Sequence, residues 1–200
     1  MGLNDWVSGQ FRRPTGFGGR IVTFVMNRMN KALYDAVLGE IGNGQEVMDI
    51  GFGNGHMLKM LLKSTDSSFC GIDISPDMVK LAGKKNKAAV RNGRLVLMKA
   101  SVDDIPFEKG FDRIYTINTV YFWDDLQTGL EEIYSKLKNG GEFLNVCYTK
   151  PFLDGLKQCK TYKKYTEEEL TEAARAVGFD AETVPIDEGR SFFLRAVRNT

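Results

Sequence analysis

Apolar residues recur along this chain with two different spacings, and each spacing predicts one kind of secondary structure. Short apolar runs bounded by glycine or polar residues are typical of strands, whereas apolar residues three or four positions apart are typical of helices. We expect strands at 47–50, 69–74, 94–98, 111–117, 142–147, 181–186 and 191–197. We expect helices at 21–37, 57–62, 76–92, 124–137 and 166–177.

Strands and helices alternate along most of the chain, and this order predicts an α/β fold. We expect a doubly wound, Rossmann-like sheet of seven mostly parallel strands with helices on both faces. Only the short turn 187–190 separates the last two strands, so they should pair as an antiparallel hairpin, with the final strand running against the others. Residues 1–43 are expected to form an N-terminal arm and a helical cap, and residues 44–200 the main domain.

Composition and charge exclude several classes of protein. Apolar types make up 42% of the residues and the net charge is +1, which excludes a disordered chain and gives no overall basic surface for nucleic acid. Three cysteines, Cys70, Cys147 and Cys159, and the single histidine, His56, have no disulfide or metal-ligand spacing, so no metal is expected. This cysteine usage favours the reducing cytoplasm. We expect no targeting segment and no membrane span.

A loop of alternating glycines follows the first predicted strand. Asp49 precedes Gly51, Gly53 and Gly55 in the pattern D-x-G-x-G-x-G. Glycine lets the backbone approach a ligand closely, and the helix that follows presents free N–H groups. The dinucleotide pattern G-x-G-x-x-G would need a glycine where His56 stands, and the lysine of a phosphate-binding P-loop is missing. The loop therefore predicts a ligand site of another kind at the carboxyl ends of the strands.

A second acidic residue, Asp73, ends the second predicted strand. It lies 18 residues after Gly55, where a carboxylate can accept hydrogen bonds from both hydroxyls of a ribose. The alternative is that Asp73 only caps the next helix. Ser75 already provides a cap and Pro76 suits the first helical position, so we favour the ligand role.

These residues, with three further motifs, resemble the class I S-adenosylmethionine-dependent methyltransferases, and most closely the small-molecule group typified by the ubiquinone and menaquinone biosynthesis enzymes. The resemblance covers roughly residues 44–147. The matching segments, in order along the chain, are 47–55, 71–78, 100–107, 111–115 and 137–143. The family implies S-adenosylmethionine as cofactor, S-adenosylhomocysteine as product and the α/β fold expected above.

The resemblance implies roles for residues around the methionine end of the cofactor. Gly51, Gly53 and Gly55 would border the methionine part. Asp49 would sit under the glycine loop and help to bind the amino end. Asn118, after the fourth strand, would face the methionine group through its backbone.

The resemblance also implies roles around the nucleoside. Asp73 would hold the ribose hydroxyls and Ile74 would lie against the adenine, with Ser101 and Val102 at the adenine edge. The family often has an acidic residue where Ser101 stands. Here the hydroxyl of Ser101, or the carboxylate of Asp103, must bind the adenine amine instead.

Two segments are candidates for the acceptor side of the site. Tyr121 and Trp123 would lie near the transferred methyl group, as a substrate wall or as ordinary core packing after a strand. The basic and aromatic segment 150–165 suits a lid or substrate wall better than a nucleic-acid surface. His56 is expected beside the glycine loop rather than as a catalytic base, and the sequence offers no obvious base.

The implied activity is methyl transfer from S-adenosylmethionine to a small-molecule acceptor by in-line displacement, at oxygen, nitrogen, sulfur or carbon. Two alternatives stay open: a methyltransferase that acts on RNA or protein, and a catalytically silent protein that binds S-adenosylmethionine. A nicotinamide dehydrogenase is disfavoured by the glycine spacing. The acceptor and the oligomeric state are not set by the sequence.

Overall fold

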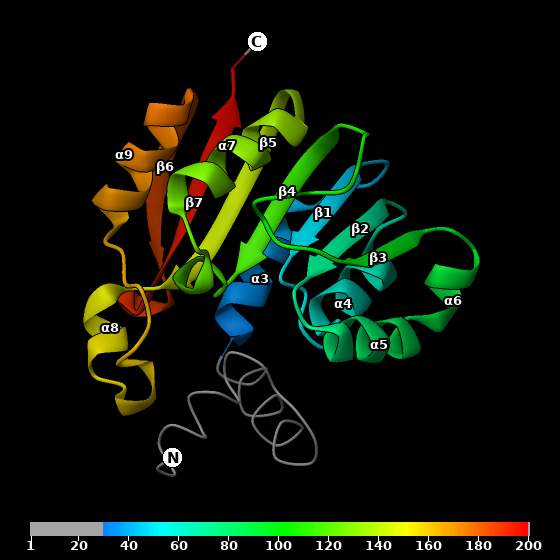
Figure 1. The fold of residues 1–200 in the computed structure, drawn as a ribbon, viewed down its shortest axis with the longest axis horizontal. Coiled ribbons are helices and arrows are strands. Elements are labelled where there is room, and N and C mark those ends of the chain that lie inside the picture. The colour runs from blue at the N-terminus through cyan, green and yellow to red at the C-terminus, as the bar shows by residue number, and fades with distance from the viewer. Residues whose placement is uncertain (1–29, 200) are drawn as a thin grey trace.

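A computed structural model describes residues 30–199 of the chain, and its centre is a single sheet (Figure 1). The strands are β1 (Glu46–Ile50), β2 (Ser68–Asp73), β3 (Leu95–Lys99), β4 (Phe111–Ile117), β5 (Leu137–Tyr148), β6 (Phe179–Ile186) and β7 (Ser191–Arg198). The α-helices are α3 (Lys31–Glu40), α4 (His56–Ser64), α5 (Pro76–Lys85), α6 (Lys87–Arg91), α7 (Leu126–Lys136), α8 (Lys150–Asp154) and α9 (Glu167–Val177). Short 3₁₀ helices are η1 (Val120–Phe122), η2 (Lys157–Cys159) and η3 (Asp187–Gly189).

The sheet confirms the predicted fold class. Its seven strands lie in the order β3-β2-β1-β4-β5-β7-β6. β1 to β5 pair in parallel, whereas β7 runs antiparallel to both of its neighbours, β5 and β6. The short connection through η3 joins β6 and β7 as the expected hairpin.

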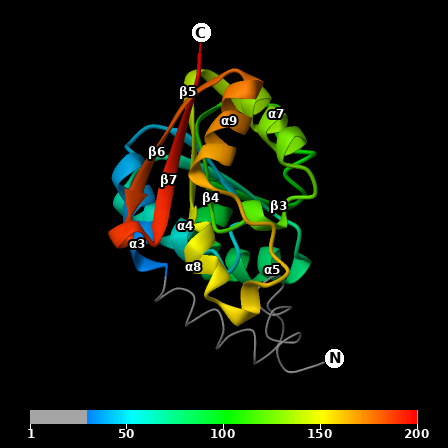
Figure 2. The same ribbon diagram turned by 90° about the vertical axis from the view of Figure 1, so that its left-hand side faces the viewer.

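Helices cover both faces of this sheet. α7 and α9 pack together on one face, whereas α3 and α4 lie on the other (Figure 2). β1 is buried along four of its five residues, as a central parallel strand covered on both faces should be. The arm expected at 1–20 and the first part of the helix expected at 21–37 lie outside the described residues. α3, which continues that helical pattern, packs against β4 and β5.

Several local signals fold as predicted. The Ser75 side chain accepts a hydrogen bond from the Met78 amide at the start of α5. Thr166 and Glu169 form a reciprocal capping box at the start of α9. Such signals act within one helical turn, so the sequence pattern alone is enough to place them.

The helix expected at 76–92 is broken, so this prediction was wrong in its extent. α5 ends at Lys85 and α6 begins at Lys87, with the non-helical residue Asn86 between them. The buried Asn86 amide donates to the Ala82 carbonyl at 3.1 Å and to the Gly55 carbonyl at 3.1 Å. This contact ties the break to the glycine loop, 31 residues earlier in the chain.

β5 also differs from the prediction, because it begins at Leu137 rather than at residue 142. Residues 139–141 lie within this continuous strand, where the register with β4 shifts. Phe111 pairs with Leu137, whereas Arg113 pairs with Glu142. The strand therefore starts before the glycines and continues after them, which a local reading of the glycines as a helix stop could not show.

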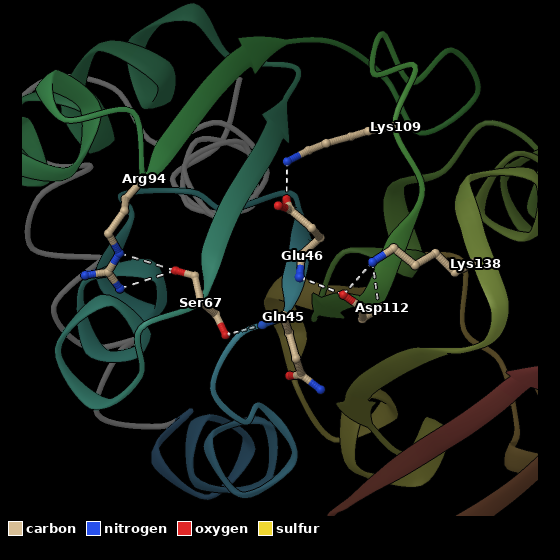
Figure 3. A network of polar contacts seen from close by, with 7 residues as sticks. All are labelled: Gln45, Glu46, Ser67, Arg94, Lys109, Asp112 and Lys138. Atoms are coloured by element: carbon tan, nitrogen blue, oxygen red, sulfur yellow. Dashed lines mark hydrogen bonds and ion pairs between the residues drawn. The ribbon is translucent and has the colours of Figure 1, made fainter.

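Polar contacts fasten the amino ends of the strands (Figure 3). The Asp112 carboxylate accepts the Glu46 amide at 2.8 Å and the Lys138 ammonium at 2.9 Å. Ser67 accepts the Gln45 amide at 2.9 Å, and the Arg94 guanidinium binds the Ser67 carbonyl. These contacts hold β1, β2 and β4 together at the end of the sheet opposite to their carboxyl ends.

Candidate functional site

The described residues enclose a cavity of about 390 Å³ at the carboxyl ends of the parallel strands. This is the expected place for a ligand in an open α/β sheet. Nearly all of the site residues predicted from the sequence line it. They are Asp49, Gly51, Gly53, Asp73, Ile74, Ser101, Val102, Asn118, Tyr121 and Trp123. Gly55 does not line the cavity.

The three glycines of the loop are required for two different reasons. A side chain at Gly51 would overlap Thr119, and a Cβ at Gly55 would lie 2.7 Å from the Cβ of Ala82. Gly53 has nothing within 4 Å of its Cβ position and lines the cavity. Gly51 and Gly55 therefore allow close packing of the protein on itself, whereas Gly53 keeps space open on the ligand side.

Asp73 orders the glycine loop as well as facing the cavity. Its Oδ2 accepts the Gly53 amide at 2.9 Å and its Oδ1 accepts the Ser75 amide at 2.8 Å. The residue is only 8% exposed. Asp73 thus joins the end of β2 to the loop after β1, and it caps the turn before α5 as well. A carboxylate has about four lone-pair sites, so these two bonds do not exclude a ligand.

Asp49 lies beneath the glycine loop. The Tyr115 hydroxyl donates to its Oδ2 at 2.7 Å. Burial raises the pKa of the Asp49 carboxyl to about 8, because the charged form is poorly solvated; the bond from Tyr115 opposes this shift and the nearby Asp73 charge adds to it. Asp49 is therefore largely protonated at neutral pH unless a cation approaches.

The predicted adenine side of the cavity combines one exposed apolar group with a hydroxyl–carboxylate pair. Ile74 is 38% exposed although it is large and apolar. The Ser101 hydroxyl donates to Oδ2 of Asp103 at 3.3 Å, and the buried Oδ1 of Asp103 has no hydrogen-bond partner among the described residues. Ile74 and Ser101 line the cavity, whereas Asp103 is not among the lining residues.

Aromatic side chains form the other end of the cavity. Tyr162 stacks on Tyr121 with ring centroids 5.8 Å apart and meets Phe122 edge-on at 4.7 Å. Trp123 lies against Phe143 and donates its indole N–H to Thr119 at 3.3 Å. Tyr121 and Trp123 are buried, as core packing would require, and both also line the cavity. Their role as a substrate wall stays a prediction.

The basic segment 150–165 closes over this aromatic end. Leu153, Leu156 and Tyr162 from this segment line the cavity. The Lys163 ammonium donates to the backbone carbonyls of Trp123 and Asp124, at 2.8 and 2.5 Å. Lys164 pairs with Asp154 of α8 at 2.7 Å. Two of its lysines therefore hold the segment in place, as expected for a wall.

His56 begins α4 and lines the cavity beside the glycine loop. Its ring lies 5.6 Å from that of Tyr34. Burial lowers the pKa of His56, and the nearby Lys85 and Lys59 charges lower it further, so the imidazole is neutral at pH 7.

Sequence reasoning missed several lining residues, among them Asn30, Tyr34, Thr119 and Tyr148. Tyr148 is the last residue of β5, one position beyond the predicted strand. Its place at the carboxyl end of a central strand is a signal that could have identified it. Asn30 stands just before α3, and no local pattern marks it as a site residue.

Two kinds of feature are not found in the described range. Within residues 30–199, no three His, Cys, Asp or Glu side chains gather in a way that would hold a metal ion. No helix in the same range is long and apolar enough to cross a membrane. Cys70, Cys147 and Cys159 are all buried and free.

Comparison with known proteins agrees with this geometry. The family described as a methyltransferase domain matches residues 47–141, which contain the glycine loop and β1 to β4. The ubiquinone/menaquinone biosynthesis C-methyltransferase UbiE of Geotalea daltonii is 30% identical over 138 residues. That alignment covers 68% of this chain and 58% of the relative. The region 47–141 of this chain is thus similar to the S-adenosylmethionine-dependent methyltransferases.

Other relatives of this chain carry different names. The uncharacterized methyltransferase YdaC of Bacillus subtilis is 29% identical over 126 residues, covering 61% of this chain and 67% of the relative. The malonyl-[acyl-carrier protein] O-methyltransferase of Priestia megaterium is 25% identical, covering 59% and 42%. The matched region thus spans between 42% and 67% of the length of these three relatives.

Solved structures share the fold. A putative methyltransferase of Haloferax volcanii, described in a complex with the Trm112 methyltransferase activator, aligns with a TM-score of 0.78 at 20% identity, covering 100% of this chain and 99% of that one. A SAM-dependent methyltransferase from Aquifex aeolicus aligns with a TM-score of 0.74 at 21% identity, covering 86% and 93%. At these identities the likeness concerns the fold alone.

The raised pKa of Asp49 predicts a pH dependence of cofactor binding. The cofactor's ammonium favours the ionised carboxylate, so affinity for S-adenosylmethionine should rise between pH 6 and about 8, by up to about tenfold per pH unit. Calorimetry in buffers of different ionisation enthalpy should detect the released proton. Asp49→Asn, which has no proton to lose, should flatten the profile. An unchanged profile in that variant would contradict the role of Asp49.

The same pKa shift has a consequence for the cofactor-free protein. The folded-state pKa of Asp49 lies above its ordinary value of 3.8, so between about pH 4 and pH 8 the folded state binds more protons than the unfolded state. The contribution of Asp49 to stability should therefore decrease as pH rises through this range.

Proposed function

We propose that this chain transfers a methyl group from S-adenosylmethionine to a small-molecule acceptor. The observation that carries the proposal is one continuous cavity with two different ends. The glycine loop, Asp73 and Ile74 line one end, and aromatic and aliphatic side chains around Tyr121 line the other. A cofactor and an uncharged acceptor can therefore lie side by side, shielded from water.

The residues present fit the cofactor. Gly53 leaves open space where a side chain would intrude, Asp73 offers a carboxylate for the ribose, and Ile74 is an exposed apolar surface for the adenine. Ser101 lines the cavity and its hydroxyl suits the adenine amine, with the Asp103 carboxylate behind it. We assign Asp49, Gly51 and the backbone of Asn118 to the methionine end. Gly55 does not contact the cofactor in this assignment. It supports the loop by packing against α5 and the adjoining Asn86.

The bound cofactor supplies an electrophilic methyl group on a sulfonium. The task of the protein is then to orient the acceptor for in-line displacement and to exclude water. Tyr121 and Trp123 are suited to this because both are buried and face the cavity. Burial raises the pKa of the Tyr121 hydroxyl well above its usual range, so this hydroxyl does not act as a base at neutral pH, and Tyr121 contributes its ring as a wall.

One observation favours a different acceptor, RNA. Exposed cations on α5 and α6, among them Lys80, Lys84, Lys87 and Arg91, make no ion pair with any described residue. A solvated helix face explains them equally well. Two observations favour a small molecule. The cavity has an aromatic lining, and Lys163 and Lys164 are already bound to other groups of the protein.

The test is calorimetric titration with S-adenosylmethionine, S-adenosylhomocysteine and NADH, followed by a methyl-transfer assay. The proposal expects micromolar binding of the first two, no NADH signal, and transfer to small acceptors but not to RNA. Transfer to RNA would show that the acceptor is RNA and not a small molecule. Binding without transfer to any class would favour a catalytically silent protein. Absence of S-adenosylmethionine binding would overturn the cofactor assignment.

Further predictions from the sequence stay proposals. We propose that residues 1–43 form an arm and cap to the domain at 44–200, and that the protein works in the cytoplasm. The Haloferax neighbour is described with an activator, so a partner protein is a separate hypothesis for this chain. Repeating the titration with the full chain and with a cell extract depleted of small molecules would test whether a partner raises the affinity.

A further inference from the structure

Hydrogen bonds link several polar side chains at the aromatic end of the cavity, and each of these bonds has an assignable donor and acceptor. The series starts at the backbone amide of Tyr148, which lies 3.2 Å from Oδ1 of Asn118. A backbone N–H can only donate, so the side-chain atom of Asn118 that faces β5 must be its oxygen. The Tyr121 hydroxyl, 3.0 Å from the same oxygen, agrees with this orientation.

The orientation of Asn118 determines that of Asn30. With its oxygen directed at β5, Asn118 presents its Nδ2 to Asn30 Oδ1 at 3.1 Å. An amide nitrogen donates, so the atom of Asn30 that receives it must be the carbonyl oxygen. The amide assignment, which is normally ambiguous, is therefore set by a chain of donors that begins at the backbone.

The orientation of Asn30 in turn determines the hydroxyl of Tyr148. The Tyr148 oxygen lies 2.9 Å from the same Asn30 Oδ1, which can only accept. Tyr148 must therefore donate its single hydroxyl proton to Asn30. What remains on the Tyr148 oxygen is the capacity to accept a hydrogen bond. Tyr148 and Asn30 both line the cavity and are 8% and 7% exposed.

Tyr121 differs from Tyr148 in this respect. The Tyr121 oxygen accepts the Tyr148 amide at 2.6 Å and has two acceptors for its own proton, Asn118 Oδ1 at 3.0 Å and the Tyr148 carbonyl at 3.2 Å. Its hydrogen-bonding groups are thus used within the protein. Of these two hydroxyls, the one on Tyr148 keeps an accepting capacity that these hydrogen bonds do not use, and Tyr148 lines the cavity.

We infer that Tyr148 is a specificity residue that selects acceptors carrying an O–H or N–H group. Its hydroxyl can receive a proton from the acceptor but cannot offer one. Leu153, Leu156 and Phe122 line the same cavity, so an uncharged apolar body suits the rest of the acceptor. The acceptor class is therefore an apolar compound with a hydroxyl or an amine, such as a phenol or an aniline. This inference rests on the proposed function, since it assigns the acceptor end of the same cavity.

An acceptor with only an ether or carbonyl oxygen would place two lone pairs against each other. Burying such an unsatisfied pair is costly, and sites built around one ligand hydrogen bond discriminate strongly against analogues that lack it. We expect donor-bearing probes to bind at least about tenfold more tightly than matched probes without a donor.

The experiment measures binding of two probe pairs by ligand-observed NMR, with and without S-adenosylhomocysteine. The pairs are 4-methylphenol with 4-methylanisole, and 4-toluidine with its N,N-dimethyl form. The wild-type chain should prefer the first member of each pair. Tyr148→Phe should remove the preference, because the accepting oxygen is lost. Asn30→Ala should reduce it, because the Tyr148 proton is then released and can be offered to a ligand.

Tyr165→Phe is the matched control, because Tyr165 lies in the segment 150–165 that follows β5 and is not among the lining residues. It should retain the wild-type preference, and thermal unfolding should show that all three variants are folded. Equal affinities in the wild type, a preference that survives in Tyr148→Phe, or no binding of either donor at millimolar concentration would overturn the inference. Because binding is read without turnover, a retained preference in a chain that transfers no methyl group would refute the proposed function alone.

Discussion

Gly53→Val is expected to abolish S-adenosylmethionine binding, with a loss of at least about a hundredfold, while the domain stays folded. No atom lies within 4 Å of the Cβ position at Gly53, and the residue lines the cavity, so valine would occupy the space of the ligand rather than collide with the protein. The backbone there has a φ of +53°, so valine also brings strain of about 1–3 kcal/mol. Calorimetry and thermal unfolding together separate the two effects.

Gly44→Val is the matched control for that strain. Gly44 also has a positive φ, +70°, with no atom within 4 Å of the Cβ position, and it does not line the cavity. It should lose comparable stability but keep its affinity for the cofactor. Gly55→Ala should differ from Gly53→Val in both measurements. It should lose more stability, because its Cβ would meet Ala82, and it should lose less affinity for the cofactor. Normal binding by Gly53→Val would refute the assignment of the loop.

Asp73→Ala is expected to weaken S-adenosylmethionine binding by about 1.5–3 kcal/mol, the range for hydrogen bonds to a charged group. This corresponds to a loss of roughly tenfold to a hundredfold in affinity. The structure adds a second reason for the loss, because Asp73 also accepts the amide of Gly53 and so positions the glycine loop. Calorimetric titration measures the total effect.

Two comparisons separate these contributions. If Asp73 binds the ribose, the wild type should discriminate against the 2′-deoxy form of S-adenosylhomocysteine, and the variant should bind both forms equally. Asp77→Ala removes a nearby acidic residue from the exposed first turn of α5 and should change neither affinity. A variant that still discriminates between the two ligands would leave Asp73 with the loop-ordering role only.

Local patterns were sufficient for most of the fold. The alternation of strands and helices predicted the sheet and its final hairpin, because the periods of buried positions report which face of each element meets the core. The capping residues Ser75 and Thr166 bond within one turn, so their helix starts could be placed from neighbours in the chain. The order of the motifs also indicated the family.

Contacts between distant segments decided the rest. Asn86 breaks the helix expected at 76–92 and bonds to Gly55, which no local period reveals. The sequence pattern does not distinguish the three loop glycines. Only the packing of Thr119 and Ala82 against two of them separates structural positions from the ligand-facing Gly53. The contacts of Lys163 with the backbone carbonyls of Trp123 and Asp124 are likewise invisible in the local pattern of segment 150–165.

The sequence by itself determined that this is an α/β chain with an acidic residue and a glycine loop after its first strand, because these features depend on the order and spacing of residues. Only the tertiary structure decided what faces the acceptor. Asn30 and Tyr148 are 118 positions apart, and neither belongs to a motif. Their hydrogen bond, and the proton direction that follows from it, exist because folding brings the start of α3 to the carboxyl end of β5.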